Sequence, residues 1–245
     1  MSIQRIYTDE LAANFGYYAI WMPGTPIKLG VIGTLDKNVF SPVSTLENFN
    51  ISYGIIRDRS KNDFKYASAG AVTVSQKASG EAAEGSKLGK ADAGVIIEFN
   101  KSNAIYFNAL GTLNHYIADK LALGNAIMEL YKKGQWKKEW VVITQLVEAD
   151  SATILISKEK GAKLELKAKA DLKPAEIQLV NADFDSENSF SSSLSFKIVA
   201  KSGISPLFKL MGIKEPWFQE ATFNNRDINQ EQSENLVFTD FEVQI

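Results

Sequence analysis

The chain has 245 residues, of which 45% are hydrophobic and 23% are charged, and its formal net charge is −2. This is the composition of an ordinary soluble globular protein with enough apolar mass for a core, and a charge so close to zero gives no general attraction to nucleic acid. There is no cysteine, which excludes disulfides, thiolate metal sites and a cysteine nucleophile, and agrees with a cytosolic location.

The first sixty residues predict short elements separated by turns. A short helix is expected at 9–15, ended by Gly16, and one helical turn at 44–47, which has the residue types of a capping box. Two of the expected segments, 27–32 and 33–40, are short and lie around a turn at 36–38. The strands are expected at 17–22, 27–32, 33–40 and 51–57.

The stretch 66–94 is unusual because 17 of its 29 residues are alanine, glycine or serine. Such a composition fits either a flexible linker or weak strands around Val72 and Val74, and strands that bury little can detach at low cost. The next segments, 93–99 and 104–110, predict a hairpin with a turn at 100–103.

The central part predicts one long helix and three strands. Apolar residues recur at steps of three and four from 112 to 133, and Gly134 follows as an expected C-cap, so the main helix is placed at about 112–133. The run 140–147 is apolar and β-branched with little alternation, as in a strand covered on both faces. A partner strand is expected at 152–157, and 163–170 alternates lysine or glutamate with leucine or alanine.

The last third predicts strands at 176–180, 193–199 and 236–245, a polar loop at 181–192 and a short helix within 204–211. Strands are many and the convincing helix is one, so the predicted class is α+β with a largely antiparallel sheet. We expect an α+β domain at 1–214 and an acidic segment at 215–245, which has seven acidic residues against Arg226 alone. This segment is interpreted either as a solvated tail or as a cover over the lysine-rich region 131–173.

Catalytic signals are few. His115 is the only histidine, and it could serve a hydrolase together with Asp119 or a nearby serine, although a surface or cap histidine is the commoner case. Asp183, Asp185 and Glu187 have the alternation of a calcium loop but lack the glycine and distal glutamate of an EF-hand. We therefore predict no enzyme activity, no cofactor and no metal.

Five segments resemble the gasdermin pore-forming domain in order and spacing, over roughly residues 10–200. The run 140–147, preceded by a helix and Gly134, is similar to the family's "YVV-T-E-V" strand. The opening 15–23 resembles the "GY…LP" start of bacterial members. The other similar segments are the hairpin 95–99 with 105–110 and the strand 194–199, which resembles a closing "L-A-F/Y-R-V" strand. Bacterial members usually have a lipidated cysteine near the N-terminus, which is missing here.

The resemblance implies a soluble precursor, cytoplasmic when inactive, that moves to a membrane when a C-terminal segment is released, usually by a protease. Two regions, about 66–105 and 140–172, would then extend into β-hairpins that oligomerise as a pore with membrane lipids as partners. A pore strand needs lipid-facing apolar residues alternating with lumen-facing polar ones. The strand 163–170 has this alternation, although a sheet with one solvated face produces the same pattern.

The lipid-contact candidates are tryptophans that suit a membrane interface and lysines that attract anionic headgroups. They are Trp136, Lys137, Lys138, Trp140, Lys163, Lys167 and Lys169. The alternative function is a non-enzymatic α+β binding module whose hairpins form a partner surface without membrane activity.

Overall fold

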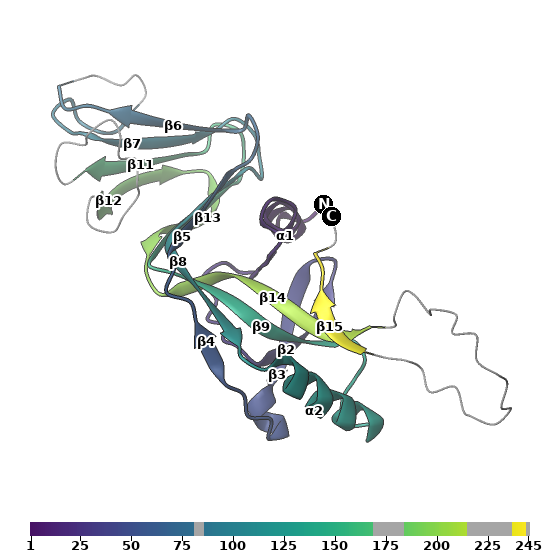
Figure 1. Ribbon diagram of the computed structural model, residues 1–245. Helices are drawn as coiled ribbons and strands as arrows, with labels where there is room; N and C mark the ends of the chain where they lie inside the picture. The colour runs from purple at the N-terminus through teal and green to yellow at the C-terminus, as the bar shows by residue number, and fades with distance from the viewer. Residues whose placement is uncertain (81–85, 169–183, 215–236, 244–245) are drawn as a thin grey trace, which may run out of the picture.

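The computed structural model describes residues 1–80, 86–168, 184–214 and 237–243. Within them the protein is mostly antiparallel sheet with two α-helices and one 3-10 turn (Figure 1). The N-terminal elements are α1 (Ile3–Phe15), β1 (Tyr18–Ala19), β2 (Val31–Asp36), β3 (Val39–Thr45), η1 (Leu46–Phe49), β4 (Ile55–Arg57), β5 (Asn62–Ala67), β6 (Val72–Lys77), β7 (Gly94–Phe99) and β8 (Ile105–Ile117). The remaining elements are α2 (Lys120–Lys132), β9 (Trp140–Ala149), β10 (Ser151–Ser157), β11 (Lys163–Ala168), β12 (Phe184–Ser192), β13 (Leu194–Lys201), β14 (Ile204–Lys214) and β15 (Val237–Phe241).

The strands form two sheets. The main sheet has 11 strands, with the central order β1-β14-β9-β8-β10-β13, and the second sheet has the order β12-β11-β7-β6. The second sheet bends away from the main sheet, and α1 lies on the inner side of this bend (Figure 1). The class is thus the predicted largely antiparallel one, with less helix than the label α+β suggests.

Buried side chains form three clusters. One lies beneath α2 and includes Ile127 and Phe208, and a second lies beneath α1 and includes Leu11 and Phe107. The third joins the second sheet to the top of β10 and includes Leu155. Each helix therefore covers its own part of the main sheet, and the second sheet has a separate small core.

The predicted start of the main helix was wrong. Residues 112–117 continue β8 and pair with both β4 and β9, so the helix begins only at Lys120. The Asp119 side chain accepts a hydrogen bond from the backbone N–H of Ala122 at 2.8 Å, which makes Asp119 the N-cap. Ladder pairing on both sides of β8 outweighs the helical spacing of its apolar residues.

Two other predictions near the C-terminus were also wrong. The predicted helix within 204–211 is β14, a strand of 11 residues that is mostly buried and lies between β9 on one side and β1 and β15 on the other. The predicted polar loop at 181–192 includes β12, which pairs with β11 from Lys163 to Ala168. The predicted strand at 176–180 lies outside the described residues.

The hairpins and turns that the sequence predicted are confirmed at several points. The turn at 36–38 joins β2 to β3, α1 ends at the left-handed Gly16, and the run from Trp140 forms β9 in the middle of the main sheet. Within the stretch rich in small residues, Val72–Lys77 form β6, so the predicted strand around Val72 and Val74 is present. The predicted last strand is β15, at Val237–Phe241.

Candidate functional site: two bent hairpins

Two long hairpins run side by side through both sheets. In the first, β5 pairs with β8 in the main sheet while β6 pairs with β7 in the second sheet. In the other, β10 pairs with β13 and β11 pairs with β12. The hairpins touch because β8 pairs with β10 and β7 pairs with β11. We call them hairpin 1 (residues 62–112) and hairpin 2 (residues 151–201).

Each hairpin has two arms, and each arm has one strand in each sheet: β5 with β6, β7 with β8, β10 with β11, and β12 with β13. The order of these four arms is the same on both sides of the bend. In the main sheet it is β13-β10-β8-β5, and in the second sheet it is β12-β11-β7-β6. Each arm therefore crosses from one sheet to the other without changing its neighbours. The four arms therefore form one four-stranded ribbon with a sharp corner in it, visible at the upper end of the main sheet in Figure 1.

Every arm has one left-handed residue at this corner. They are Gly70 (φ 63°), Asn103 (φ 58°), Gly161 (φ 83°) and Ser193 (φ 53°). Residues other than glycine are rarely stable at positive φ, and strands need strongly negative φ. The corner is thus made by four residues held outside the strand conformation, and a straight ribbon requires all four to change.

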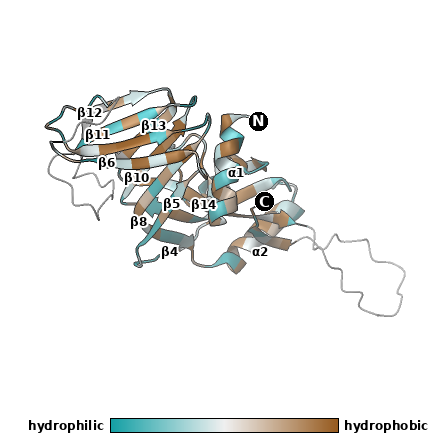
Figure 2. Ribbon diagram, turned by 90° about the horizontal axis from the view of Figure 1, so that it is seen from above, coloured by the Kyte–Doolittle hydropathy of each residue, from teal (hydrophilic) through white to brown (hydrophobic). Residues whose placement is uncertain are grey.

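The register of the second sheet sorts its side chains by polarity. One face has the row Leu164, Ile97 and Val74 across three strands, and the apolar row of Leu166 and Val95 lies beside it. Glu165, Ile96 and Ser75 lie between them and face the other way, so the opposite face has polar residues on β11 and β6 and an isoleucine on β7. Hydrophobic and hydrophilic residues interleave along these strands in Figure 2. In the folded protein, this apolar face belongs to the third buried cluster.

A segment that we call the strap, residues 86–92 in the connection between β6 and β7, folds back over the polar face. The carboxylate of Glu165 on β11 is 3% exposed and accepts hydrogen bonds from the Ser86 hydroxyl at 2.8 Å and from the backbone N–H of Lys87 at 2.7 Å. The tip of hairpin 1 is thereby fastened to hairpin 2.

The other end of the strap is held by Lys77 of β6. Its ammonium group, on a residue that is also 3% exposed, donates to the carbonyl oxygens of Gly89 at 2.8 Å and Asp92 at 2.5 Å. Lys167 completes the attachment with an ion pair to Asp92 at 2.6 Å. Hydrogen bonding to the Lys167 ammonium is the largest cause that lowers the pKa of Asp92, which keeps this carboxylate charged.

The C-terminal strand β15 closes the outer edge of β14. Phe238 packs over Gly124 of α2, and the Tyr18 hydroxyl donates to the backbone carbonyl oxygen of Glu242 at 2.8 Å. Asp240 forms an ion pair with Lys120 at 3.0 Å. Part of the acidic segment predicted at 215–245 is therefore docked on the domain, while residues 215–236 lie outside the described ranges.

The sequence-predicted lipid contacts do not form one surface. Trp136 is only 3% exposed and packs with Phe49 and Trp140, while Lys137 lies over the Trp140 ring at 5.6 Å. These residues, with Lys138, lie between α2 and β9, at the opposite end of the molecule from β11 in Figure 1.

On β11, Lys163 is 3.8 Å from Glu165, and Lys167 is paired with Asp92 of the strap. The polar stripe of β11 is therefore covered and paired in this conformation. Lys169 lies outside the described residues.

Neither the corner nor the strap was predicted from the sequence. Gly70 and Gly161 between predicted strands were a usable signal for the corner, whereas nothing in the pattern distinguishes Lys77 or Glu165 from an exposed strand residue. Both charges are buried only because the strap returns to them.

The predicted histidine–aspartate pair does not form. Nε2 of His115 lies 3.0 Å from Oε2 of Glu148 on β9, whereas Asp119 caps α2. Within the described ranges, no three histidine, aspartate or glutamate side chains gather as metal ligands. The calcium-loop candidate at 183–187 cannot be placed, because the side chains of these residues lie outside the described part of the structure.

Comparison with known proteins gives distant structural similarity. No protein-family model and no curated protein match the sequence. Among solved structures, the chain is similar to a bacterial gasdermin from Bradyrhizobium tropiciagri, with 15% sequence identity, 86% of each chain covered and a TM-score of 0.35. This is the family that the sequence motifs resemble. The function is inferred from the hairpins themselves.

In the described ranges of the chain, no helix has the length and hydropathy that a membrane span requires.

Proposed function

We propose that this protein is the inactive precursor of a gasdermin-like membrane pore, in which hairpins 1 and 2 straighten and insert as β-strands once β15 is released. The observation that carries the proposal is that the four arms have the same order on both sides of the corner. Straightening would produce a four-stranded sheet without breaking a strand pair within the ribbon, so the change requires a hinge motion rather than refolding of the ladders.

The length of the arms supports this proposal. The eight strands of the two hairpins have between 6 and 13 residues, and each arm joins two of them. A membrane-crossing strand needs about 9–11 residues, so a straight arm is long enough. The apolar row with Ile97 and Leu164 would face lipid, and the opposite face, where Glu165 and Ser75 flank Ile96, would face the pore lumen.

The second inserting region in this proposal is 151–201, which differs from the 140–172 expected from the sequence. The residues Trp140–Ala149 form β9, which is bonded to β14 on one side and to β8 and β2 on the other. Removing β9 would break up the main sheet. Hairpin 2 instead lies at the side of the main sheet, where β13 is the last strand of the central order.

The proposed restraint is the docked β15, with release by cleavage between β14 and β15. The test uses the absence of cysteine in the chain. A protease recognition sequence is placed within 215–236, and Lys214→Cys is combined with Val237→Cys, because these residues are register partners in β14 and β15. Cross-strand partners lie within the range that a disulfide spans.

Dye release from vesicles that contain anionic lipid is the measurement. We expect no release from the uncut protein, release from cut protein without the disulfide, and release from cut, cross-linked protein only after a reductant is added. The single-cysteine variants are the controls for the substitutions. If the cut, reduced protein releases no dye, the pore proposal is refuted and the binding-module alternative is favoured. Equal release from uncut and cut protein would refute restraint by β15.

A further inference from the structure

The main sheet has a basic groove on the side of β4, apart from both the strap and the corner. Two adjoining hollows of about 660 and 680 Å³ share Ile55 and Arg57 of β4 with Leu113 and His115 of β8. The first hollow extends over Arg59 and Lys61, and the second over Leu29, Tyr53 and Leu146. One end of the groove is therefore cationic, and the other combines apolar side chains with the charged residues Lys28, Glu47 and Glu148.

Most charges around the groove already have partners. Lys28 pairs with Glu47 at 3.2 Å, Lys61 pairs with Asp150, and Glu148 pairs with His115.

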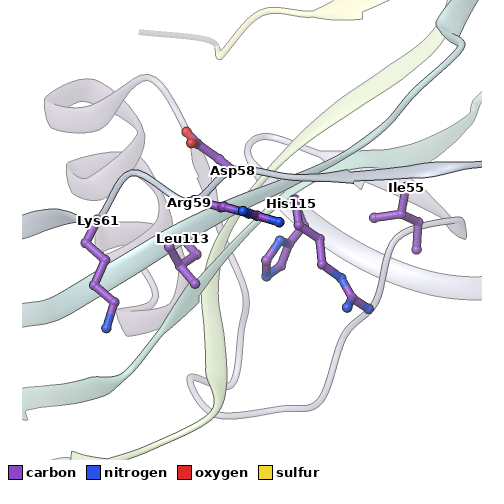
Figure 3. Close-up of a pocket in the computed structure, with 7 residues that line it drawn as sticks. Ile55, Asp58, Arg59, Lys61, Leu113 and His115 are labelled. Carbon is purple, nitrogen blue, oxygen red and sulfur yellow. The ribbon is translucent and has the colours of Figure 1, made fainter.

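Asp58, the remaining acid of the groove, accepts the backbone N–H of Ser60 at 2.9 Å. Its side chain points away from the hollow in Figure 3. The acids at the groove therefore do not neutralise its two arginines.

The guanidinium groups of Arg57 and Arg59 are different. Both residues are exposed, and neither guanidinium group has an ion pair or hydrogen bond to another described residue. Arg57 is the register partner of His115, and the Arg59 side chain points toward His115 in Figure 3. Nδ1 of His115 is buried and has no partner among the described residues. Two arginines without an ion pair thus line the same hollow as this imidazole.

We propose that this groove binds the phosphate group of a phosphomonoester, held by Arg57 and Arg59 beside His115. A guanidinium offers a planar pair of N–H donors that matches two phosphate oxygens, and two such groups balance the charge of a phosphomonoester, which is about −1.5 to −2 at neutral pH. The apolar side of the groove, with Leu29 and Leu146, would take the group esterified to the phosphate. The proposal does not depend on the pore function.

The phosphate has two possible sources, a soluble phosphomonoester or the headgroup of a lipid such as phosphatidic acid. His115 is the only histidine of the chain, so its imidazole proton resonances report on the groove without assignment of other residues. The soluble arm of the experiment titrates the full chain with inorganic phosphate and with glycerol phosphate at constant pH and ionic strength. The lipid arm measures co-sedimentation with phosphatidylcholine vesicles that contain either phosphatidic acid or phosphatidylserine.

We expect saturable shifts of the His115 resonances in the soluble arm, or selective sedimentation with phosphatidic acid in the lipid arm, and the arm that responds identifies the source. Arg57→Gln and Arg59→Gln should each weaken that binding about tenfold or more, the effect of losing a hydrogen bond between charged groups. Arg59→Lys keeps the charge but loses the planar pair of N–H donors, and should also weaken binding.

Lys101→Gln is the matched control, since it removes an exposed charge from the corner instead of the groove. Thermal unfolding of each variant checks that it is folded. The proposal is overturned if neither arm shows binding, or if the two arginine variants bind as well as the wild-type chain and the Lys101→Gln control.

Discussion

The buried carboxylate of Glu165 on β11 accepts a hydrogen bond from the backbone N–H of Lys87 at 2.7 Å, and so joins the tip of one hairpin to the arm of the other. The neighbouring N–H of Leu88 points to the same oxygen at 3.3 Å. One acidic side chain therefore supports much of the strap, and the strap covers the face that we propose as the pore lumen.

Glu165→Gln should loosen the strap. The amide keeps one acceptor but loses the charge, and hydrogen bonds to charged groups contribute about 1.5–3 kcal/mol each. We expect faster hydrogen exchange at Lys87 and Leu88 while the amides of β9 stay protected. Glu98→Gln is the control, because Glu98 lies on the same face of the adjacent β7 without such contacts to the strap. Equal exchange in both variants would contradict this role of Glu165.

The contact of Tyr66 with Glu10 predicts a loss of stability at alkaline pH. Burial, followed by the hydrogen bond to the Glu10 carboxylate at 2.7 Å, raises the pKa of Tyr66 to about 12. A tyrosine in the unfolded chain ionises near pH 10, so this contribution is complete below about pH 10 and is lost as the pH rises toward 12. Burial also raises the pKa of Tyr106 to about 12, with the same sign.

Urea unfolding between pH 9 and 12 measures this effect. The free energy of unfolding should fall with pH over the upper part of this range, and Tyr66→Phe should make the fall less steep. The same variant should be less stable than wild type at pH 8, because Phe cannot donate to Glu10. A slope that is unchanged in Tyr66→Phe would contradict the assignment.

Gly124 of α2 allows a test of β15 docking without cleavage. A Cβ at this position would lie 3.4 Å from the Phe238 ring, so alanine just fits, whereas a longer side chain would displace Phe238. Gly124→Ala should stabilise the protein by up to about 1 kcal/mol through helix propensity. Gly124→Leu should detach β15, and under the proposed function it should release vesicle contents without a protease. If both variants behave alike in susceptibility of the C-terminus to proteolysis, β15 is not held by this contact.

The sequence predicts strands with a clear apolar or alternating pattern better than strands whose pattern also fits a helix or a loop. The β-branched residues in the apolar run from Trp140 predicted a covered strand correctly, and the alternation of β11 gave its buried face correctly at Leu164 and Leu166. The apolar residues of β14, by contrast, have no period of two because both faces are buried, so their spacing also fits a helix. For the serine-rich β12, its local composition favours a loop, and only pairing with β11 makes it a strand.

The candidate site was predictable only in part for a related reason. Two regions of hairpins could be expected from the sequence, but the shared corner depends on four backbones bending at the same level. The positive φ of Asn103 and Ser193 is imposed by the ladders on either side of them. No local pattern predicts this conformation, because both residue types are common in ordinary turns.

The corner glycines offer the most direct test of straightening. Gly161 has a φ of 83°, and a Cβ added to it would meet nothing within 4 Å, so Gly161→Val acts on the backbone conformation and not on packing. A non-glycine residue pays about 1–2 kcal/mol in the left-handed region, and valine favours strands. We expect the bent form to lose about this much stability, and cut protein to release vesicle contents faster than wild type.

Gly203→Val is the matched control, because Gly203 also has a positive φ of 65° and open space around it, but it lies between β13 and β14, beyond both hairpins. The two variants should lose similar stability in urea unfolding, whereas only Gly161→Val should speed release. Conversely, Asn103→Gly should relieve strain at the corner, stabilise the bent form and slow release. If Gly161→Val and Gly203→Val release dye at the same rate, the corner is not the hinge, and general destabilisation accounts for the effect.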